Sequence, residues 1–340
     1  MDPITHGLIG ASASQSFAAR DTLRPAAFAG FISAMLPDLD VLIGSSTDPL
    51  LNLELHRQFT HAFIFIPAGA FIAAGLLWWL VRKKLSFGET YLFCLLGYAT
   101  AGIADTFTSY GVQLLWPFTG GRFAWNLISV FDPLFSLVII LTAGYAFYSR
   151  KRAFAWLAFG WIALYLLFAL AQQEKSKTIA LDLAEQRGHP VRKLIVKPTL
   201  ANELLWSIRY VSGDRLYADG VRLMPFSEPR VYEGTSTPLA PWRVTFAHIE
   251  GSTAYRDIKR FAALSDGVLI SHPDEETVLG DGRYAMLPTS VAPLWGIEPD
   301  TLKPHNHVDF NTYRDASEEV LNPFKNMLLG RSIDQPPDPQ

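Results

Sequence analysis

Four apolar stretches in the first half of this chain are each long enough to cross a lipid bilayer as an α-helix. They are residues 61–81, 90–110, 127–148 and 153–172. A hydrocarbon core of about 30 Å requires about 20 helical residues. Two shorter stretches, 4–19 and 24–36, precede them and could either span the bilayer or form a re-entrant hairpin. We therefore predict an α-helical membrane bundle of about six helices, two of them short, over residues 1–172.

The basic residues of the loops are unevenly divided between the two ends of these helices. One side carries Arg20, Arg24, Arg82, Lys83, Lys84, Arg150, Lys151 and Arg152, and the other carries only Arg57 and Arg122. Cytoplasmic loops hold the excess of Lys and Arg, so the larger group should face the cytoplasm. We predict a protein integral to a bacterial-type plasma (inner) membrane, with both termini extracytoplasmic.

The chain changes character after residue 172, where charged residues, Pro and Gly replace the apolar stretches. The alternating segments "LLWSIRYV" and "RLYADGVRL" flank the turn signal "SGD" and predict a β-hairpin near 204–223. Further expected elements are strands at 241–248, 267–271 and 283–287 and an amphipathic helix at 255–265. We predict a small soluble α+β domain at 173–330 that caps the outer face, followed by a disordered tail at 331–340.

Composition narrows the classes of protein that fit. The net charge is -3 and no basic cluster exceeds three residues, so nothing favours nucleic-acid binding. Cys94 is the only cysteine, which excludes a disulfide framework and a cysteine metal site. The segment "MDPITHG" lacks the basic region and cleavage site of a secretory signal, so we read it as mature sequence.

Histidines and aspartates gather at the predicted outer ends of the helices. The candidate metal ligands are His6, Asp38, Asp40, His56, His61, Asp105 and Asp132. At a rise of about 1.5 Å per residue, all of them fall within one or two helical turns of one plane. Mixed carboxylate and imidazole ligands suit a divalent metal ion, zinc first, with manganese or iron as alternatives. A bound cation would also relieve the repulsion among the clustered carboxylates.

Most of these residues have a simpler structural interpretation when each is considered alone. His6 could be an ordinary helix residue, and Asp38 and Asp40 could be turn formers beside Pro37. Asp132 precedes Pro133, so it could instead cap the start of a helix. Asp105 is harder to dismiss, because a carboxylate within "YATAGIADTFTSYG" needs a partner or a cavity.

The segment "HRQFTH" places two histidines five residues apart at the start of an apolar stretch. On one regular helix His56 and His61 would lie about 140° apart around the axis, so they would not share a face. We therefore expect a helix to begin between them, with Thr60 as its N-cap and His61 in its first turn. Arg57 is expected to pair with a carboxylate or an anionic substrate, or else to anchor the helix at headgroup level.

The ordered motifs "MDPITH", "LPDLD", "HRQFTH", "DTFTSYG" and "FDP" resemble those of the membrane-bound metal-dependent hydrolase family (YdjM-like). The similarity covers about the first 172 residues, together with "PTLANELLW" at 198–206. The resemblance implies that the seven candidate ligands form the family's metal site. A looser similarity to helical zinc-dependent phospholipases C implies phosphoester chemistry.

We expect an integral-membrane hydrolase that acts on an ester or phosphoester of a lipid or lipid-linked substrate at the outer interface. Asp40 or Asp105 would act as the base, and Arg57 would receive a phosphate. The alternatives are a metal-stabilised scaffold that binds a partner and, less favoured, a divalent-cation transporter.

The sequence leaves two features of the outer domain undecided. Trp206, Tyr210 and Tyr217 could face the membrane or form a core, and the "HNH" histidines at 305–307 are expected to face solvent. The sequence does not indicate an oligomeric state.

Overall fold

The computed structural model describes residues 1–333 apart from residues 274 and 276. The chain divides into two compact units, each described here by itself. Unit 1 comprises Met1–Ile43, Leu55–Ala171 and Leu200–Asn202, and unit 2 comprises Gly44–Glu54, Gln172–Thr199 and Glu203–Gln340. Most of the predicted disordered tail, from residue 334 onward, lies outside the described residues.

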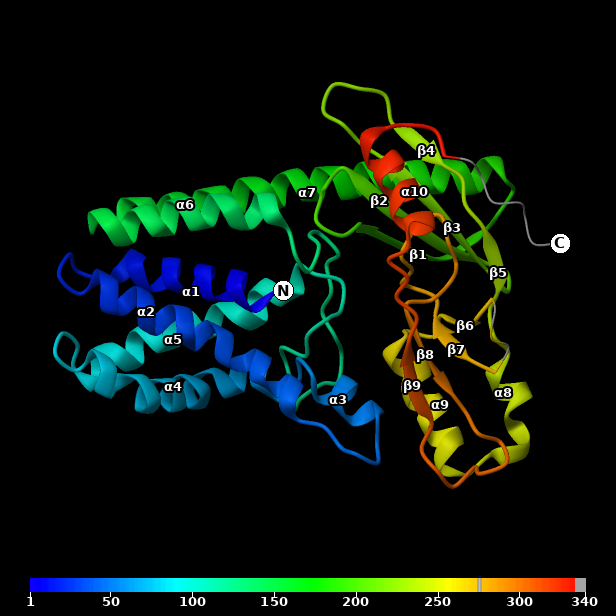
Figure 1. Cartoon of the computed structure of the whole chain (residues 1–340), viewed down its shortest axis with the longest axis horizontal. Helices are drawn as coiled ribbons and strands as arrows, with labels where there is room; N and C mark the ends of the chain where they lie inside the picture. Colours follow the sequence, from blue (N-terminus) through cyan, green and yellow to red (C-terminus); the bar gives the residue numbers. More distant parts are fainter. Residues whose placement is uncertain (274, 276, 334–340) are drawn as a thin grey trace. The chain divides into compact units, whose positions relative to one another are not determined.

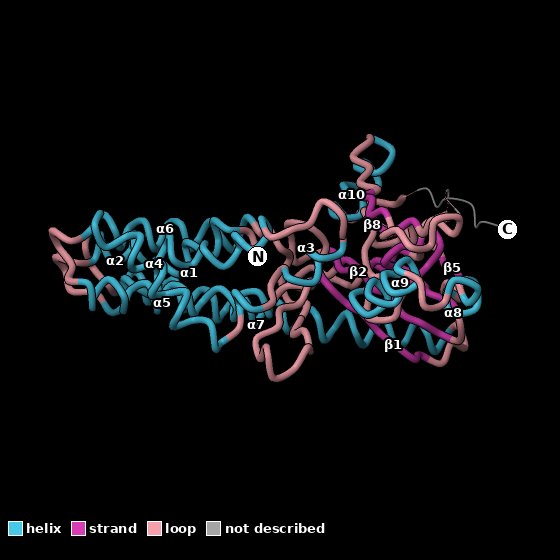
Figure 2. Tube along the Cα trace, turned by 90° about the horizontal axis from the view of Figure 1, so that it is seen from below, coloured by secondary structure: helices cyan, strands magenta, loops and turns pink. Residues whose placement is uncertain are grey.

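Unit 1 is built from helices that run alongside one another in both views (Figures 1 and 2). They are α1 (Pro3–Phe17), α2 (Leu23–Met35), α4 (Ile66–Val81), α5 (Phe87–Thr106), α6 (Pro133–Ser149) and the first part of α7 (Ala153–Gln186). Among the residues that the structure describes, three segments are long and apolar enough to span a membrane, namely Leu23–Leu42, Phe63–Val81 and Ala153–Gln186, and α6 is a shorter apolar helix. The helical N-terminal region is therefore confirmed, with three candidate spans in place of the predicted four long spans and two short helices.

Several helix boundaries differ from the predicted ones for local reasons. The stretch predicted from residue 61 begins with short 3-10 turns, and α4 starts only at Ile66, followed by Pro67. Helix α5 starts earlier than predicted because Ser86 and Glu89 form a capping box. The predicted start of the next helix at residue 127 was wrong. Helix α6 begins at Pro133, because Asp132 caps it and proline is favoured at the first helical position.

Glycines allow α1, α2 and α5 to approach closely at the centre of unit 1. A Cβ atom on Gly30 of α2 would lie 2.4 Å from the carbonyl oxygen of Gly10 and 2.1 Å from Ser14 Oγ. A Cβ atom on Gly97 of α5 would lie 2.3 Å from the carbonyl oxygen of Gly30. Close backbone contact at small residues is how helices associate within a membrane, where apolar burial gives little driving force.

We predict that Gly30→Ala destabilises the protein, because the added methyl group meets a backbone oxygen that cannot move aside. The expected loss is about 1–3 kcal/mol, typical of overpacking. The measurement is thermal unfolding of the purified protein in detergent. Gly75→Ala in α4 is the matched control, since a Cβ atom there meets nothing within 4 Å. Equal melting temperatures for the two variants would contradict this packing account.

The described residues of unit 2 form two antiparallel sheets. The first has the order β1-β2-β3-β4 with β5 also paired to β3, and the second has the order β6-β7-β8-β9. The strands are β1 (Val191–Pro198), β2 (Leu205–Ser212), β3 (Arg215–Arg222), β4 (Arg230–Tyr232), β5 (Ser236–Pro238), β6 (Leu269–Ser271), β7 (Leu279–Asp281), β8 (Trp295–Glu298) and β9 (Asp309–Thr312). The helices are α3 (Leu50–Leu55, up to Glu54 in this unit), the last part of α7, α8 (Trp242–Thr245), α9 (Thr253–Leu264) and α10 (Glu318–Leu329). The predicted hairpin is confirmed as β2 and β3, and the predicted amphipathic helix as α9.

Two of the predicted strands in unit 2 were wrong. Residues 241–248 form α8 and a 3-10 turn, because the helix follows Pro241 directly and leaves no extended segment. Residues 283–287 lie in turns after β7. The aromatic residues Trp206 and Tyr210 are fully buried against α7, which confirms the core alternative for them.

Within unit 2, Arg260 of α9 binds two acidic side chains of the segment Gly44–Glu54. Its guanidinium group bonds both carboxylate oxygens of Asp48 at 3.0–3.1 Å and both of Glu54 at 2.8 Å. Leu50, between these two acids, is fully buried in the core that α9 also joins. Burial alone raises the pKa of Asp48, but the hydrogen bond and charge of Arg260 outweigh it, so the pKa lies below its usual value.

This lowered pKa predicts an acid-sensitive contribution to stability. Asp48 stabilises the fold above its unfolded pKa of about 3.9, and the contribution is lost as the pH falls through the lower folded value. Asp48→Asn should therefore cost about 1 kcal/mol at pH 7 and have a shrinking effect below about pH 4. Unfolding midpoints of both proteins measured across this pH range test the point. A cost that does not change with pH would show that Asp48 acts through packing alone.

Candidate metal centre

Four side chains from separate segments of unit 1 converge on one buried point. They are His6 from α1, Asp38 from a 3-10 helix at Leu36–Leu42, His61 from a 3-10 turn, and Asp105 from α5. His6 Nε2 lies 3.3 Å from Asp105 Oδ1 and 3.8 Å from Asp38 Oδ2. His61 Nε2 lies 3.5 Å from Asp38 Oδ1 and 3.3 Å from Asp105 Oδ2. Each imidazole thus faces both carboxylates.

Local sequence explains how these segments reach the same point. Asp2 caps α1 and Pro3 begins it, which places His6 within the first turns of the helix. Pro37 follows the end of α2 and opens the 3-10 helix that carries Asp38. Gly102 of α5 lets the backbone of His61 approach, since a Cβ atom there would lie 2.5 Å from the His61 carbonyl oxygen.

Several of the facing atoms have no hydrogen-bond partner, whereas Asp105 Oδ1 accepts from the Met1 amino group and Asp105 Oδ2 forms an ion pair with Arg57. Among the described residues, no hydrogen-bond partner is found for His6 Nε2, His61 Nε2, Asp38 Oδ2 or Asp105 Oδ2. Buried polar atoms of native proteins are normally satisfied, so such a cluster calls for an explanation. Ligands about 2.0–2.2 Å from a tetrahedral ion are separated by about 3.3–3.6 Å. One donor atom each from His6, Asp38 and Asp105 lies within 4.8 Å of the other two, and His61 Nε2 faces the second oxygen of each carboxylate. The donor set and its geometry fit a divalent cation.

Asp40 lies behind this point and has other partners. Its carboxylate accepts hydrogen bonds from the Arg57 backbone N–H at 2.9 Å and from Thr60 Oγ1 at 2.7 Å, and it lies 2.6 Å from His56 Nδ1. Asp40 Oδ2 is also 3.4 Å from His61 Nδ1, on the opposite side of the ring from Nε2. Asp40 therefore orients the two histidines, and both of its oxygens are engaged by these partners.

The expected helix start within "HRQFTH" was wrong. Thr60 does not cap a helix, because its hydroxyl group donates to Asp40 and the following residues form 3-10 turns. His61 is buried, whereas the side chain of His56 is 33 % exposed. The two histidines therefore differ: His61 faces Asp38 and Asp105, whereas His56 is partly exposed and contacts Asp40.

Arg57 adopts the carboxylate pairing that was one of its expected roles. Its Nε atom lies 3.0 Å from Asp105 Oδ2, and Nη1 donates to Thr108 Oγ1 at 3.2 Å. The residue has a left-handed backbone with φ of 58°, which is uncommon for a non-glycine residue. The amino group of Met1 also contacts Asp105 Oδ1. Sequence reasoning missed this contact and that of Thr108, although Thr108 belongs to the "DTFTSYG" segment.

Asp132 has a different environment from the other predicted ligands. It accepts hydrogen bonds from the backbone N–H groups of Leu134 and Phe135, and Tyr165 donates its hydroxyl proton to the remaining oxygen at 2.7 Å. The N-cap alternative is thus confirmed. The geometry gives no support to a ligand role, because both carboxylate oxygens are already engaged.

A second histidine–aspartate group lies in unit 2. His307 Nδ1 is 2.7 Å from Asp257 Oδ2 and 3.8 Å from Asp48 Oδ1. Arg260 already pairs with both aspartates, so an arginine supplies the positive charge at this point. Of the two "HNH" histidines expected to face solvent, His305 is exposed and His307 is held by Asp257.

Unit 1 thus combines a helical bundle containing apolar candidate spans with a buried centre of two histidines and two aspartates, the arrangement of a helical membrane protein with a candidate metal site. The family model described as YdjM inner membrane protein matches residues 1–176, more than half of the chain. The chain therefore belongs to the YdjM family of inner membrane proteins. The resemblance noted from its motifs is confirmed at the level of the family.

A curated relative supports the same placement. The chain is 35% identical over 109 residues to the inner membrane protein YbcI of Escherichia coli (strain K12). This alignment covers 30% of the chain and 61% of the relative, so it spans less than two thirds of that protein. No solved structure is significantly similar to the chain.

We predict that Asp132→Ala lowers stability by about 1 kcal/mol, the typical cost of losing an N-cap. Asp132→Asn should cost less, because the amide oxygen still accepts from the first helical N–H groups. Thermal unfolding in detergent provides the measurement. An asparagine variant as unstable as the alanine variant would indicate that the charge of Asp132, and not its capping oxygen, is required.

Proposed function

We propose that His6, Asp38, His61 and Asp105 bind a divalent cation and that the protein is a metal-dependent hydrolase of the inner membrane. The observation that carries the proposal is the convergence of two Nε2 atoms and two carboxylates at 3.3–3.8 Å. The proposed substrate is an ester or phosphoester of a lipid or lipid-linked molecule. The proposed ion is zinc, with manganese and iron as alternatives, because the donors are nitrogen and oxygen without thiolates.

Two points support this proposal: the chemistry that a divalent cation provides, and the solvent exposure of the side chains around it. When bound, a divalent cation acts as a Lewis acid toward an ester or phosphoryl oxygen and makes water more acidic. His6, His61 and Asp105 are closed off from solvent, whereas Asp38 is 12% exposed and His56 is 33% exposed. A substrate would therefore approach beside His56 and Asp38.

We assign the proton-accepting role to His56 in place of Asp40 or Asp105. Asp40 and Asp105 are fully buried, and both already interact with cationic or hydrogen-bonding groups. His56 is partly exposed, and Asp40 holds its Nδ1 atom at 2.6 Å, which orients the ring and leaves Nε2 to accept a proton. Arg57 holds Asp105 in place and adds positive charge near the substrate, and it does not need to leave that pair.

The competing proposal is a scaffold in which the cation only ties helices together. It is favoured by the same convergence, because the four donors join α1, α5 and two 3-10 segments. The two proposals differ at His56, which a structural cation site does not require. We retain the scaffold as the second candidate because the four donors join separate segments of unit 1. A divalent-cation transporter is the less favoured third candidate.

The test uses purified full-length protein, elemental analysis and a panel of p-nitrophenyl esters, phosphodiesters and phospholipids. We expect one or more zinc ions per chain, and loss of metal and of hydrolysis in Asp38→Ala and His61→Ala. We expect His56→Gln to keep the metal while lowering kcat by about 100-fold. His305→Gln is the matched control, because His305 is an exposed histidine of unit 2.

The outcomes separate the two candidates. Full metal content in Asp38→Ala or His61→Ala would refute the centre itself. Bound metal without hydrolysis of any substrate, together with instability after metal removal, would favour the scaffold. Unchanged turnover in His56→Gln would reject the assignment of the base while leaving the metal centre intact.

A further inference from the structure

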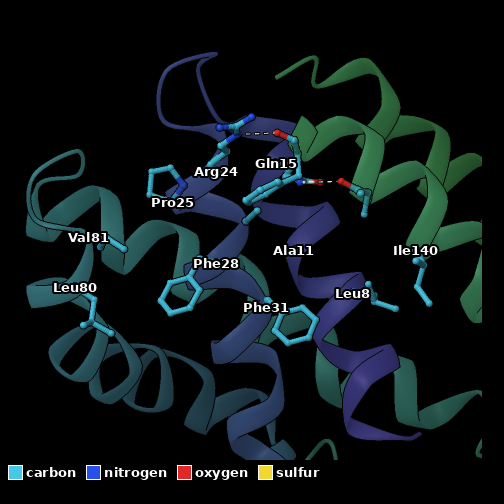
Figure 3. A pocket seen from close by; sticks show the side chains of 14 residues that line it. Leu8, Ala11, Gln15, Arg24, Pro25, Phe28, Phe31, Leu80, Val81 and Ile140 are labelled. Carbon is cyan, nitrogen blue, oxygen red and sulfur yellow. Dashed lines mark hydrogen bonds between the residues drawn. The ribbon is translucent and has the colours of Figure 1, made fainter. Parts of the chain in front are cut away.

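A cavity of about 670 Å³ lies among α1, α2, α4 and α6 of unit 1, and Figure 3 shows the side chains that line it. Its walls are almost entirely apolar, with Leu8, Phe28, Phe31, Leu80 and Ile140 among the lining residues. Its volume lies in the range of small-molecule sites, about 300–1,000 Å³. Apolar walls of this kind suit a hydrocarbon chain.

The polar side chains that line this cavity are Gln15 and Arg24, and Figure 3 shows them near each other. Gln15 is 1% exposed; its Nε2 donates to the carbonyl oxygen of Ala143 at 3.1 Å, and no partner is found for its Oε1 among the described residues. Arg24 donates from Nε to the carbonyl oxygen of Phe147 at 3.0 Å and from Nη2 to that of Tyr148 at 3.3 Å. The cavity thus combines apolar walls with a cation and a buried acceptor.

The charge around Arg24 is predominantly positive. The connection between α1 and α2 carries Arg20, and the connection between α6 and α7 carries Arg150 and Arg152, with Asp21 as the acid. Arg150 lies 3.9 Å from Asp21, so these two connections meet at the same end of the bundle. Figure 1 shows this end of unit 1 opposite the N-terminus, from which α1 carries His6. The cationic end is therefore remote from the candidate metal centre.

We propose that this cavity binds an anionic phospholipid of the bilayer. An acyl chain fills the apolar space, the phosphate lies at Arg24, and Gln15 Oε1 accepts a hydrogen bond from a hydroxyl group or water of the headgroup region. Arginine at a membrane interface attracts anionic lipid headgroups, and a planar guanidinium group matches phosphate geometry. The proposal does not depend on hydrolysis, because the phosphate would lie at Arg24, at the end of the bundle opposite the candidate metal centre.

The experiment is native mass spectrometry of the full-length protein in detergent, titrated with phosphatidylglycerol or with phosphatidylcholine of the same acyl chains. We expect phosphatidylglycerol to bind about five- to tenfold more tightly, as one interfacial arginine with its neighbours would give. Arg24→Gln should remove most of this preference while leaving weak binding of both lipids. Equal affinity for the two lipids in the native protein would overturn the proposal.

A second pair of variants tests whether the acyl chain occupies the cavity. Gly144 lines the cavity, and a Cβ atom there meets nothing within 4 Å, so Gly144→Leu should fill space without disturbing the helix. It should lower the occupancy of both lipids, whereas Gly75→Leu, an equally open glycine outside the cavity, should not. Undiminished lipid binding in a folded Gly144→Leu protein would also overturn the proposal. If that variant fails to fold, Arg24→Gln still decides the outcome.

A last control separates this site from the proposed hydrolase. His61→Ala should leave the preference for phosphatidylglycerol unchanged, because His61 does not line the cavity. Loss of the preference in His61→Ala would mean that the lipid bound at the metal centre. A dimer that Gly144→Leu abolishes, with no bound lipid in the native protein, would mean that a second copy of the chain occupies the cavity.

Discussion

The buried carboxylate of Asp105 is the constraint around which unit 1 is organised. It is fully buried, and a charge in such a place is costly unless opposite charges or a metal ion accompany it. His6, His61 and Arg57 all reach it within 3.3 Å. Because these partners come from separate segments, satisfying this one carboxylate requires α1, α5 and the segment before α4 to meet at one place.

The packing of unit 1 meets this requirement through small residues and chain breaks. Gly30 and Gly97 let three helices approach, Gly102 admits the backbone beside His61, and Pro37 ends one helix where an aspartate is needed. Each device has a cost, since glycine lowers helix propensity and proline interrupts backbone hydrogen bonding. Gly102 and Pro37 act at the centre itself, whereas Gly30 and Gly97 set the distances between the helices that carry it.

Much of this centre could be predicted from the sequence, because a membrane leaves few explanations for polar residues. A carboxylate at Asp105 within an apolar stretch required partners, and His6, Asp38 and His61 fell at the same helix ends. The sequence did not distinguish Asp40 from Asp38, because that depends on how a 3-10 helix turns each side chain. Asp132 was ambiguous for a similar reason, since an N-cap before proline has the same residue pattern as a ligand. The sheets of unit 2 were harder to predict, because several of their strands have only three or four residues and show too little alternation to be recognised.

Arg57 explains why "HRQFTH" carries an arginine between its histidines. Its backbone N–H binds Asp40 while its side chain pairs with Asp105, so one residue connects the carboxylate behind the centre with the carboxylate inside it. The left-handed backbone at Arg57 has a conformational cost, and it accompanies a charge-assisted hydrogen bond to Asp40 and an ion pair with Asp105. The same turn lets His56 reach the accessible side while His61 faces inward. A regular helix through this segment would separate the two histidines around its axis and could not supply the Asp40 contact.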